Sequence, residues 1–240
     1  MSQPSIPTDQ IKRLAIFVEG KTEMLFIERL VKEVAGRHNI RIETRSISGG
    51  TTVPRSYVTL VAAPLAGNEK FFVLIVDCQG DQQVKTRIVE EHQNLNDEGY
   101  EKIIGIRDVF PDFTADEIPK LRIGLRTRIS GKLIPVEFIL SVMEIEAWFI
   151  AETSHFSKID ASLTIPVINA VLSSDITGDV TKLPSPAASL NKIYDIVGLE
   201  YKKGAEETIE KLDYAHMYMH LGSQISDVDN LMKSLDKFLI

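Results

Sequence analysis

The sequence predicts an α/β protein: a mostly parallel sheet flanked by helices, followed by a helical C-terminal part. Short apolar runs alternate with amphipathic stripes from Leu14 to Glu152, and strand patterns fade from Ser154 onward. Alternation of this kind implies βαβ units and a parallel sheet. We therefore expect an α/β core over residues 1–152 and a helical region over residues 153–240 that packs on this core.

The strands are expected where apolar residues form short continuous or alternating runs. The run FFVLIV is continuous, as in a strand buried on both faces. The strands expected in this way are Leu14–Val18, Ile40–Ile47, Phe71–Val76, Ile103–Ile106 and Ile134–Val142.

Helices are expected where apolar residues recur at helical spacing. After Glu23 such a stripe continues to Gly36, a residue suited to ending a helix. Further helices are expected at about Arg55–Leu65, after the break at Gly49-Gly50, and over Val84–Leu95 and Glu144–Glu152.

Composition limits the class of protein. The 240 residues carry a net charge of −7, which argues against coating of nucleic acid through the overall field but allows a local basic groove. No apolar run reaches the roughly 18–20 residues of a membrane span. The first ten residues, MSQPSIPTDQ, lack signal-peptide features and are expected to form a loose leader. The lone cysteine, Cys78, excludes an internal disulfide and fits a reducing cytoplasm, so we expect a cytoplasmic protein. The lack of a long apolar run predicts no membrane partner.

Acidic residues follow three of the expected strands: Glu19, Asp77 and Asp108. The carboxyl ends of parallel strands meet at one edge of a sheet. Like charges gathered there repel one another unless they are neutralised, and Mg²⁺ favours carboxylate oxygens. The alternative is that each acid is solvated or caps the next helix. The three together favour a metal site.

Three segments resemble the Toprim superfamily. The run LAIFVEGKTE, Leu14–Glu23, is similar to the first Toprim motif of the overcoming-lysogenization-defect nucleases and RloB-like proteins. The run IVDCQGD, Ile75–Asp81, lies where the Asp-x-Asp motif is expected. The run MEIEAWFIAE, Met143–Glu152, and the fragment Tyr201-Lys202-Lys203 resemble a small uncharacterised bacterial Toprim-like family related to RloB. The resemblance implies a Toprim-like fold.

The resemblance also implies site residues. Glu19 and Asp77 would be catalytic, in a site holding Mg²⁺ or Mn²⁺. The implied metal ligands are Glu19, Glu23, Asp77, Asp81 and Glu146. The sequence departs from the motif at Gln79, which stands where the second aspartate is expected. An amide offers an oxygen but no charge, so metal affinity should fall; Asp81 could substitute if Gly80 folds the turn back.

The two acids of MEIEAWFIAE do not share a helix face, because they are two residues apart. At most one is expected to point into the site. The resemblance favours Glu146, whereas Glu144 is expected to complement the helix dipole. Trp148 is expected to be a packing residue.

Basic residues give candidate phosphate contacts: Lys21, Arg107 and Arg126. Lys21 is either a phosphate contact or a solvated loop lysine. Arg107 either forms an ion pair with Asp108 or leaves Asp108 as a further acid of the site. The basic stretch Lys120–Lys132 either follows a nucleic-acid backbone or forms a solvated face.

The function expected from these observations is Mg²⁺-dependent phosphodiester hydrolysis on nucleic acid, in a setting of defence against phage or mobile DNA that the resemblance implies. The alternative is a Toprim-like module that binds a nucleotide, nucleic acid or a partner protein without cutting it. A small-molecule phosphotransferase is a third possibility. A homodimer or a partner protein would be compatible with each.

Overall fold

The chain folds around one mixed sheet in the computed structural model, which describes residues 11–36, 38–49, 53–54, 56–61, 68–80 and 82–239. Six strands in these residues have the order β3-β2-β4-β1-β5-β6. All neighbours pair in parallel except β2 and β3, which pair antiparallel. The strands are β1 (Lys12–Val18), β2 (Ile40–Ser48), β3 (Ser56–Val61), β4 (Phe71–Asp77), β5 (Lys102–Asp108) and β6 (Val136–Ser141).

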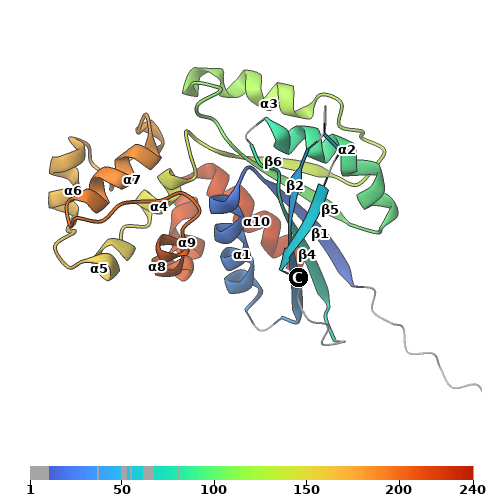
Figure 1. Ribbon diagram of the computed structural model, residues 1–240, viewed down its shortest axis with the longest axis horizontal. Coiled ribbons are helices and arrows are strands. Elements are labelled where there is room, and N and C mark those ends of the chain that lie inside the picture. The colour runs from blue at the N-terminus through green and yellow to red at the C-terminus, as the bar shows by residue number, and fades with distance from the viewer. Residues whose placement is uncertain are drawn as a thin grey trace, which may run out of the picture.

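Helices cover both faces of the sheet (Figure 1). On one face, α1 (Lys21–Ala35) and α10 (Ser226–Leu239) bury apolar residues in the cluster that contains Leu14 and Ile16 of β1. On the other, α2 (Gln83–Asp97) packs on Ala15 and Phe17, and α3 (Ile118–Arg126) packs on Leu140. Successive strand residues point to opposite faces, so a continuously apolar strand such as β1 supplies both cores.

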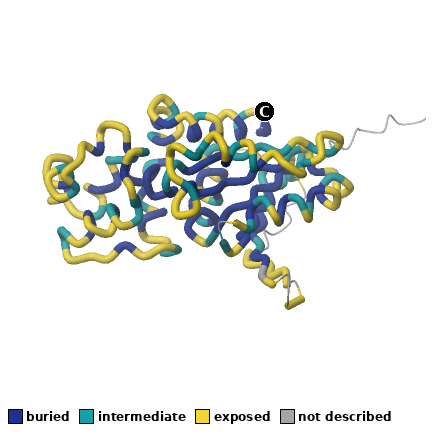
Figure 2. The backbone as a smooth tube through the Cα atoms, turned by 90° about the horizontal axis from the view of Figure 1, so that it is seen from above, coloured by how far each residue is buried: buried dark blue, intermediate teal, exposed yellow. Residues whose placement is uncertain are grey.

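The C-terminal region contains a group of short helices on the α1 side of the sheet, beyond α1 (Figure 1). Its members are α4 (Glu146–Ala151), α5 (His155–Ile159), α6 (Ile165–Leu172), α7 (Pro186–Asp195), α8 (Glu206–Lys211) and α9 (Tyr214–His220). Short 3-10 helices lie at Ala115–Glu117, Val180–Lys182 and Leu221–Ser223. Residues of this group belong to the same apolar cluster as β1 and α1. Figure 2 shows mostly buried backbone in the middle of the molecule and mostly exposed segments around it.

The predicted fold class is confirmed, as a mostly parallel sheet flanked by helices with a helical C-terminal region. The five predicted strands correspond to β1, β2, β4, β5 and β6. Within the described residues, no helix has both the length and the apolar character needed to cross a membrane. The leader, residues 1–10, lies outside the described residues.

One predicted helix is wrong. Residues 56–61 of the predicted helix Arg55–Leu65 form β3, which pairs with β2 through registers such as Arg45 with Thr59. The sequence SYVTLV is rich in β-branched residues, and pairing along an edge lets all six side chains remain exposed. Arg55 and residues 62–65 of that helix lie outside the described residues. The helix α3 was not predicted; its N-terminal turn contains Pro119, which favours a helix start.

Candidate acidic site at the carboxyl edge of the sheet

Acidic residues stand at the ends of three neighbouring central strands. Asp77 is the last residue of β4, Glu19 follows β1 directly, and Asp108 is the last residue of β5. The strand order β4-β1-β5 therefore places the ends of these three strands side by side, as the sequence predicted. Each residue is at most 8% exposed. Three buried acids at one edge define the candidate site.

Backbone contacts fix the central carboxylate. Glu19 Oε1 accepts a hydrogen bond of 2.7 Å from the backbone N–H of Asp108, which joins the ends of β1 and β5. The carbonyl of Glu19 accepts one of 2.8 Å from Gly80 N–H, in the turn after β4. In the first turn of α1, Glu23 Oε2 accepts one of 3.1 Å from Gly20 N–H. Glu19 and Glu23 therefore flank one tight strand-to-helix turn.

The turn after β4 holds Gln79 in a left-handed conformation, with φ of 57°. Its backbone N–H donates to Asp77 Oδ1 at 2.9 Å, and its side-chain amide donates to Ser46 Oγ of β2 at 2.7 Å. Burial raises the pKa of Asp77, while the hydrogen bonds from Gln79 and Ser46 lower it. Gln79 therefore acts as a donor that positions Asp77. Asp81, predicted to complete the metal shell, lies outside the described residues.

Lys203 joins the two acids that follow β6. Its Nζ lies 3.0 Å from Glu144 Oε1 and 3.7 Å from Glu146 Oε1. Both glutamates reach the same lysine because they do not share a helix: α4 begins at Glu146, and Glu144 precedes it in the connecting loop. The other oxygen of Glu144 accepts from the N–H of Ala187 at the start of α7. The hydroxyl of Tyr201 donates to Glu146 Oε1 at 2.7 Å.

The pKa values of the site are shifted toward protonation. Burial raises the pKa of Glu23 to about 7, and the charge of Glu146 adds to the shift. Burial and the charges of Glu19, Glu23 and Glu146 raise the pKa of Asp108 well above its ordinary range. Burial also raises the pKa of Glu146, against the opposing charge of Lys203. Glu19, Glu23, Asp108 and Glu146 thus interact as one electrostatic cluster.

An open cleft of about 440 Å³ gives access to part of this cluster. Its lining includes Glu19, Glu23 and Asp77, together with Lys21 and Lys203. The cleft is bounded on one side by the segment around Gly204, whose N–H donates to Thr22 Oγ1 at 2.7 Å. A loop from the C-terminal region therefore completes a site that begins in β1.

The donor set suits a hard divalent cation, because it consists of carboxylate oxygens. Two buried oxygens, Asp108 Oδ1 and Glu146 Oε2, lack a hydrogen-bond partner. Among the described residues, however, no three acidic, histidine or cysteine side chains are arranged closely enough to share one ion. The residues therefore fit a metal by their chemistry, and binding would require these side chains to draw together.

The predicted phosphate contacts lie in different surroundings. Lys21 lines the cleft. Arg107 is buried; its Nη2 pairs with Asp112 at 2.7 Å and its guanidinium lies over the ring of Phe113. It does not pair with Asp108, because consecutive strand residues point to opposite faces. Arg126 is exposed at the end of α3.

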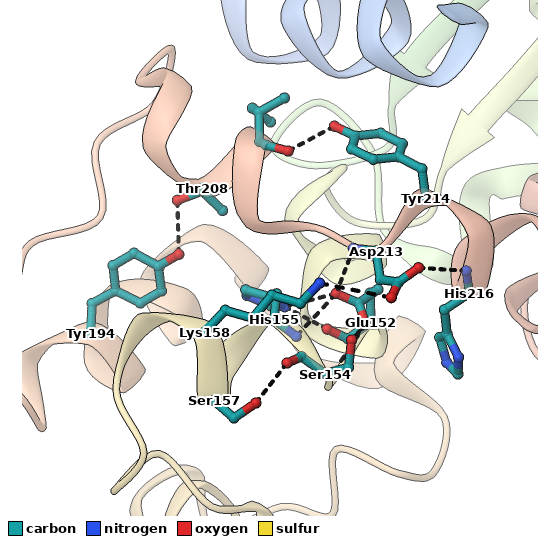
Figure 3. Close-up of polar contacts among 11 residues, drawn as sticks. Glu152, Ser154, His155, Ser157, Lys158, Tyr194, Thr208, Asp213, Tyr214 and His216 are labelled. Atoms are coloured by element: carbon teal, nitrogen blue, oxygen red, sulfur yellow. Dashed lines mark hydrogen bonds and ion pairs between the residues drawn. The ribbon is translucent and has the colours of Figure 1, made fainter. Parts of the chain in front are cut away.

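A second polar cluster lies beyond α4 and has a structural role. Glu152 is fully buried and accepts hydrogen bonds from the backbone N–H groups of Ser154, His155 and Asp213 (Figure 3). Although burial raises its pKa, the hydrogen bonds from His155, Ser154 and Asp213 lower it overall. These bonds tie α5 to the start of α9. Because its ionised form is fully satisfied, Glu152 differs from the acids of the site.

Comparisons with known proteins give little further information. No protein-family model matches the chain, and no curated protein matches its sequence. Among solved structures, a protein described as a cell surface hydrolase from Lactobacillus plantarum WCFS1 is 10% identical, with a TM-score of 0.29. The match covers 60% of this chain and 57% of that one. A likeness this distant carries no argument about function.

Sequence reasoning missed two contributors to the site, Ser46 and Lys203. Ser46 is an ordinary residue within a strand, and its hydrogen bond to Gln79 connects residues 33 positions apart. Lys203 is 59 positions from Glu144 and lies in an irregular loop. The fragment Tyr201-Lys202-Lys203 was noted for its resemblance, but no spacing pattern indicated that its side chains contact the acids.

Proposed function

We propose that this protein is a Toprim-like, Mg²⁺-dependent enzyme that hydrolyses phosphodiester bonds in nucleic acid. The observation that carries the proposal is the row of buried acids Asp77, Glu19 and Asp108 at the ends of adjacent parallel strands. Acids with raised pKa values in a cleft are typical of functional sites. Resemblance to the overcoming-lysogenization-defect nucleases and RloB adds a cytoplasmic defence role to the proposal.

Glu19, Glu23 and Asp77 line the cleft and would hold the cation, with Asp81 and Glu146 as further ligands. When bound, Mg²⁺ would polarise a phosphoryl oxygen and neutralise charge on the substrate. Gln79 and Ser46 keep Asp77 oriented. Lys21 would contact a phosphate from the rim of the cleft.

Glu23 would change its protonation state when a cation binds. Burial raises its pKa to about 7 without a cation, so ligation by Glu23 would release a proton at neutral pH. Lys203 supplies positive charge next to Glu144 and Glu146, and so limits repulsion among the acids. Glu23 thus couples cation binding to pH, and Lys203 balances the charge of the neighbouring acids.

A non-catalytic binding module is the second candidate function. Two observations favour it: Gln79 replaces the expected aspartate, and Lys203 already supplies a cation to the acids. Such a module would bind a nucleotide or nucleic acid at the same cleft and leave it intact.

The test is incubation of the protein with end-labelled DNA and RNA in Mg²⁺ or Mn²⁺. We expect cleavage that EDTA abolishes and that Glu19→Gln and Asp77→Asn reduce by at least about 100-fold, the scale of a lost electrostatic contact in a transition state. The matched control is Glu101→Gln, at the opposite edge of the sheet, where the side chain is exposed.

Cleavage that persists unchanged in both site variants would rule out this site as the origin of the activity. Binding of nucleic acid without cleavage in any metal would establish the second candidate function. Turnover of free nucleotides without strand cleavage would indicate a phosphotransferase.

A further inference from the structure

A basic surface lies beside the acidic site, on the face of the sheet covered by α2 and α3. The segment from Lys120 to Lys132 contains five basic residues and no acidic residue. Lys120 and Arg122 have ion-pair partners, Glu117 and Asp227. Arg126 and Arg128 are exposed, and no ion pair to them is found in the described part of the chain. The two guanidinium groups are therefore available to an outside partner.

Other cations gather beneath these two arginines. Lys85, in the first turn of α2, donates to Gly124 O at 2.7 Å and to Thr127 Oγ1 at 2.8 Å, which fixes the end of α3 against α2. Burial lowers the pKa of Lys85, and the positive charges of Arg128 and Arg107 lower it further. These like charges are thus close enough to repel one another. Asp112 neutralises Arg107, so an anion bound at Arg128 would relieve the remaining repulsion.

The backbone at Arg128 adds a second observation. Its φ is 66°, in the left-handed region that costs a non-glycine residue about 1 kcal/mol or more. The other described non-glycine residues in this region are Gln79 and Met143, which lie near acids of the candidate site, and Ser173, which ends α6. Conformations of this kind concentrate at functional positions. The backbone at Arg128 thus adopts an unfavourable conformation at a position where the side chain is basic and exposed.

Contacts connect this surface to the cleft. Gly80 lines the cleft and accepts a backbone hydrogen bond from Gln83, the first residue of α2. Gln82 Nε2 lies 3.4 Å from Asp112, the partner of Arg107. The first turn of α2 has no acidic residue, and the N-terminus of a helix attracts negative charge. The first turn of α2 therefore lies between the cleft rim and the end of α3, which Lys85 contacts.

We propose that the surface presenting Arg126 and Arg128, with Lys85 and Arg107 beneath it, binds the phosphodiester backbone of a nucleic acid that enters the acidic cleft. The inference rests on the proposed function, because the polymer is taken to be the substrate of that site. Guanidinium groups match phosphates through paired hydrogen bonds. With a net charge of −7, the whole molecule repels a polyanion, so binding depends on this local surface.

The test compares two double variants by fluorescence anisotropy in EDTA, with labelled single-stranded DNA, duplex DNA and RNA of one sequence. Arg126→Gln with Arg128→Gln removes two charges from the surface. The control, Lys192→Gln with Lys237→Gln, removes two exposed charges from α7 and α10. Thermal unfolding of both variants verifies that each is folded. The three probes also show which nucleic acid is preferred.

We expect the arginine variant to bind at least about tenfold more weakly. The slope of log K against log salt should become less negative by about 1.4–1.8, as for the loss of two phosphate contacts. The control should bind within about twofold of the unchanged protein. Equal affinities of the two variants, no binding by the unchanged protein, or equal binding of polyglutamate would overturn the inference.

The cleavage assay separates this inference from the proposed function. Cleavage that is reduced equally in the two double variants would support the proposed nuclease and contradict the binding role of the basic surface. Binding that depends on Arg126 and Arg128, without cleavage in Mg²⁺ or Mn²⁺, would support the binding role and contradict the proposed nuclease.

Discussion

At the scale of single residues, the pKa of each buried acid depends on how many hydrogen bonds its carboxylate accepts. Glu152 receives enough hydrogen bonds to lower its pKa despite burial, whereas Glu23 receives few and its pKa rises to about 7. Both are buried glutamates near one end of the sheet. Hydrogen bonding thus gives two buried glutamates opposite pKa shifts, a difference that the residue types alone cannot indicate.

The raised pKa of Glu23 predicts a pH-dependent stability in EDTA. The native state binds the Glu23 proton more tightly than the unfolded state does. The stability that this proton contributes is therefore fully present below about pH 4.5. It is lost as the pH rises through 7, by up to about 3 kcal/mol. Glu23→Gln should remove the part of the decline in stability that Glu23 causes and stabilise the protein at pH 8. Asp77, Asp108 and Glu146, whose pKa values are also raised, should leave a smaller decline. Urea unfolding at pH 5 and pH 8 measures it, with Glu101→Gln as control. A decline of equal size in Glu23→Gln would contradict the prediction.

Lys203 predicts a link between stability and metal. Removing its charge by Lys203→Met leaves Glu144 and Glu146 without their cation and should cost about 1–2 kcal/mol, since the lysine side chain is 52% exposed and partly screened. Millimolar Mg²⁺ should then raise the melting temperature of this variant more than that of the unchanged protein.

The control for Lys203 is Lys202→Met, whose ion pair with Glu200 is exposed. Calorimetry with and without Mg²⁺ gives both melting temperatures. Equal Mg²⁺ responses of Lys203→Met and the unchanged protein would show that the lysine and a cation do not share these acids.

At the scale of elements, α4 links the site to the helical region. Trp148 is fully buried, as expected for a packing residue, and its ring lies 6.0 Å from that of Phe26 in α1. Phe149 and Tyr214 also contact the Phe26 ring. Glu146, which Lys203 contacts, is the first residue of α4, so this aromatic packing positions Glu146 as well.

Trp148→Ala is therefore expected to cost about 3–5 kcal/mol, the usual range for truncating a buried aromatic side chain, and Trp148→Phe about half as much. Urea unfolding followed by circular dichroism measures both. Because Trp148 is the single tryptophan, its fluorescence also reports unfolding in the unchanged protein. A cost below about 1 kcal/mol for Trp148→Ala would mean that α4 is not anchored by this ring.

The elements also show how far sequence reasoning reaches. β1 and β4 were predictable because each is a continuous apolar run that ends on a polar turn, and their acids followed from the geometry of parallel strands. β3 was missed because its pattern reflects an exposed edge and not a core. Lys203 was missed because a long-range contact leaves no local pattern. The parts set by local sequence were thus predictable, and those set by tertiary contacts were not.

At the scale of the whole molecule, the α/β core and the helical region share one apolar cluster. Ile16 of β1 and Leu30 of α1 belong to the same cluster as Leu231 and Leu235 of α10. Phe71 at the start of β4 contacts Phe238, with ring centroids 5.6 Å apart. Asp227, 2% exposed, accepts a hydrogen bond from Leu140 N–H of β6. The C-terminal helix thus closes one face of the sheet.

This sharing predicts that residues 1–152 do not fold alone, although they contain every described strand. Without α10 the fragment would expose the apolar face of β1 and β4 to water, at about 25 cal/mol per Å². We expect no cooperative urea transition of Trp148 fluorescence and strong binding of an apolar dye, with both reversed when residues 153–240 are co-expressed as a second chain. A single cooperative transition of the isolated fragment would instead establish an independent α/β domain, and the acids contacted by Lys203 would then belong to an interface between two domains.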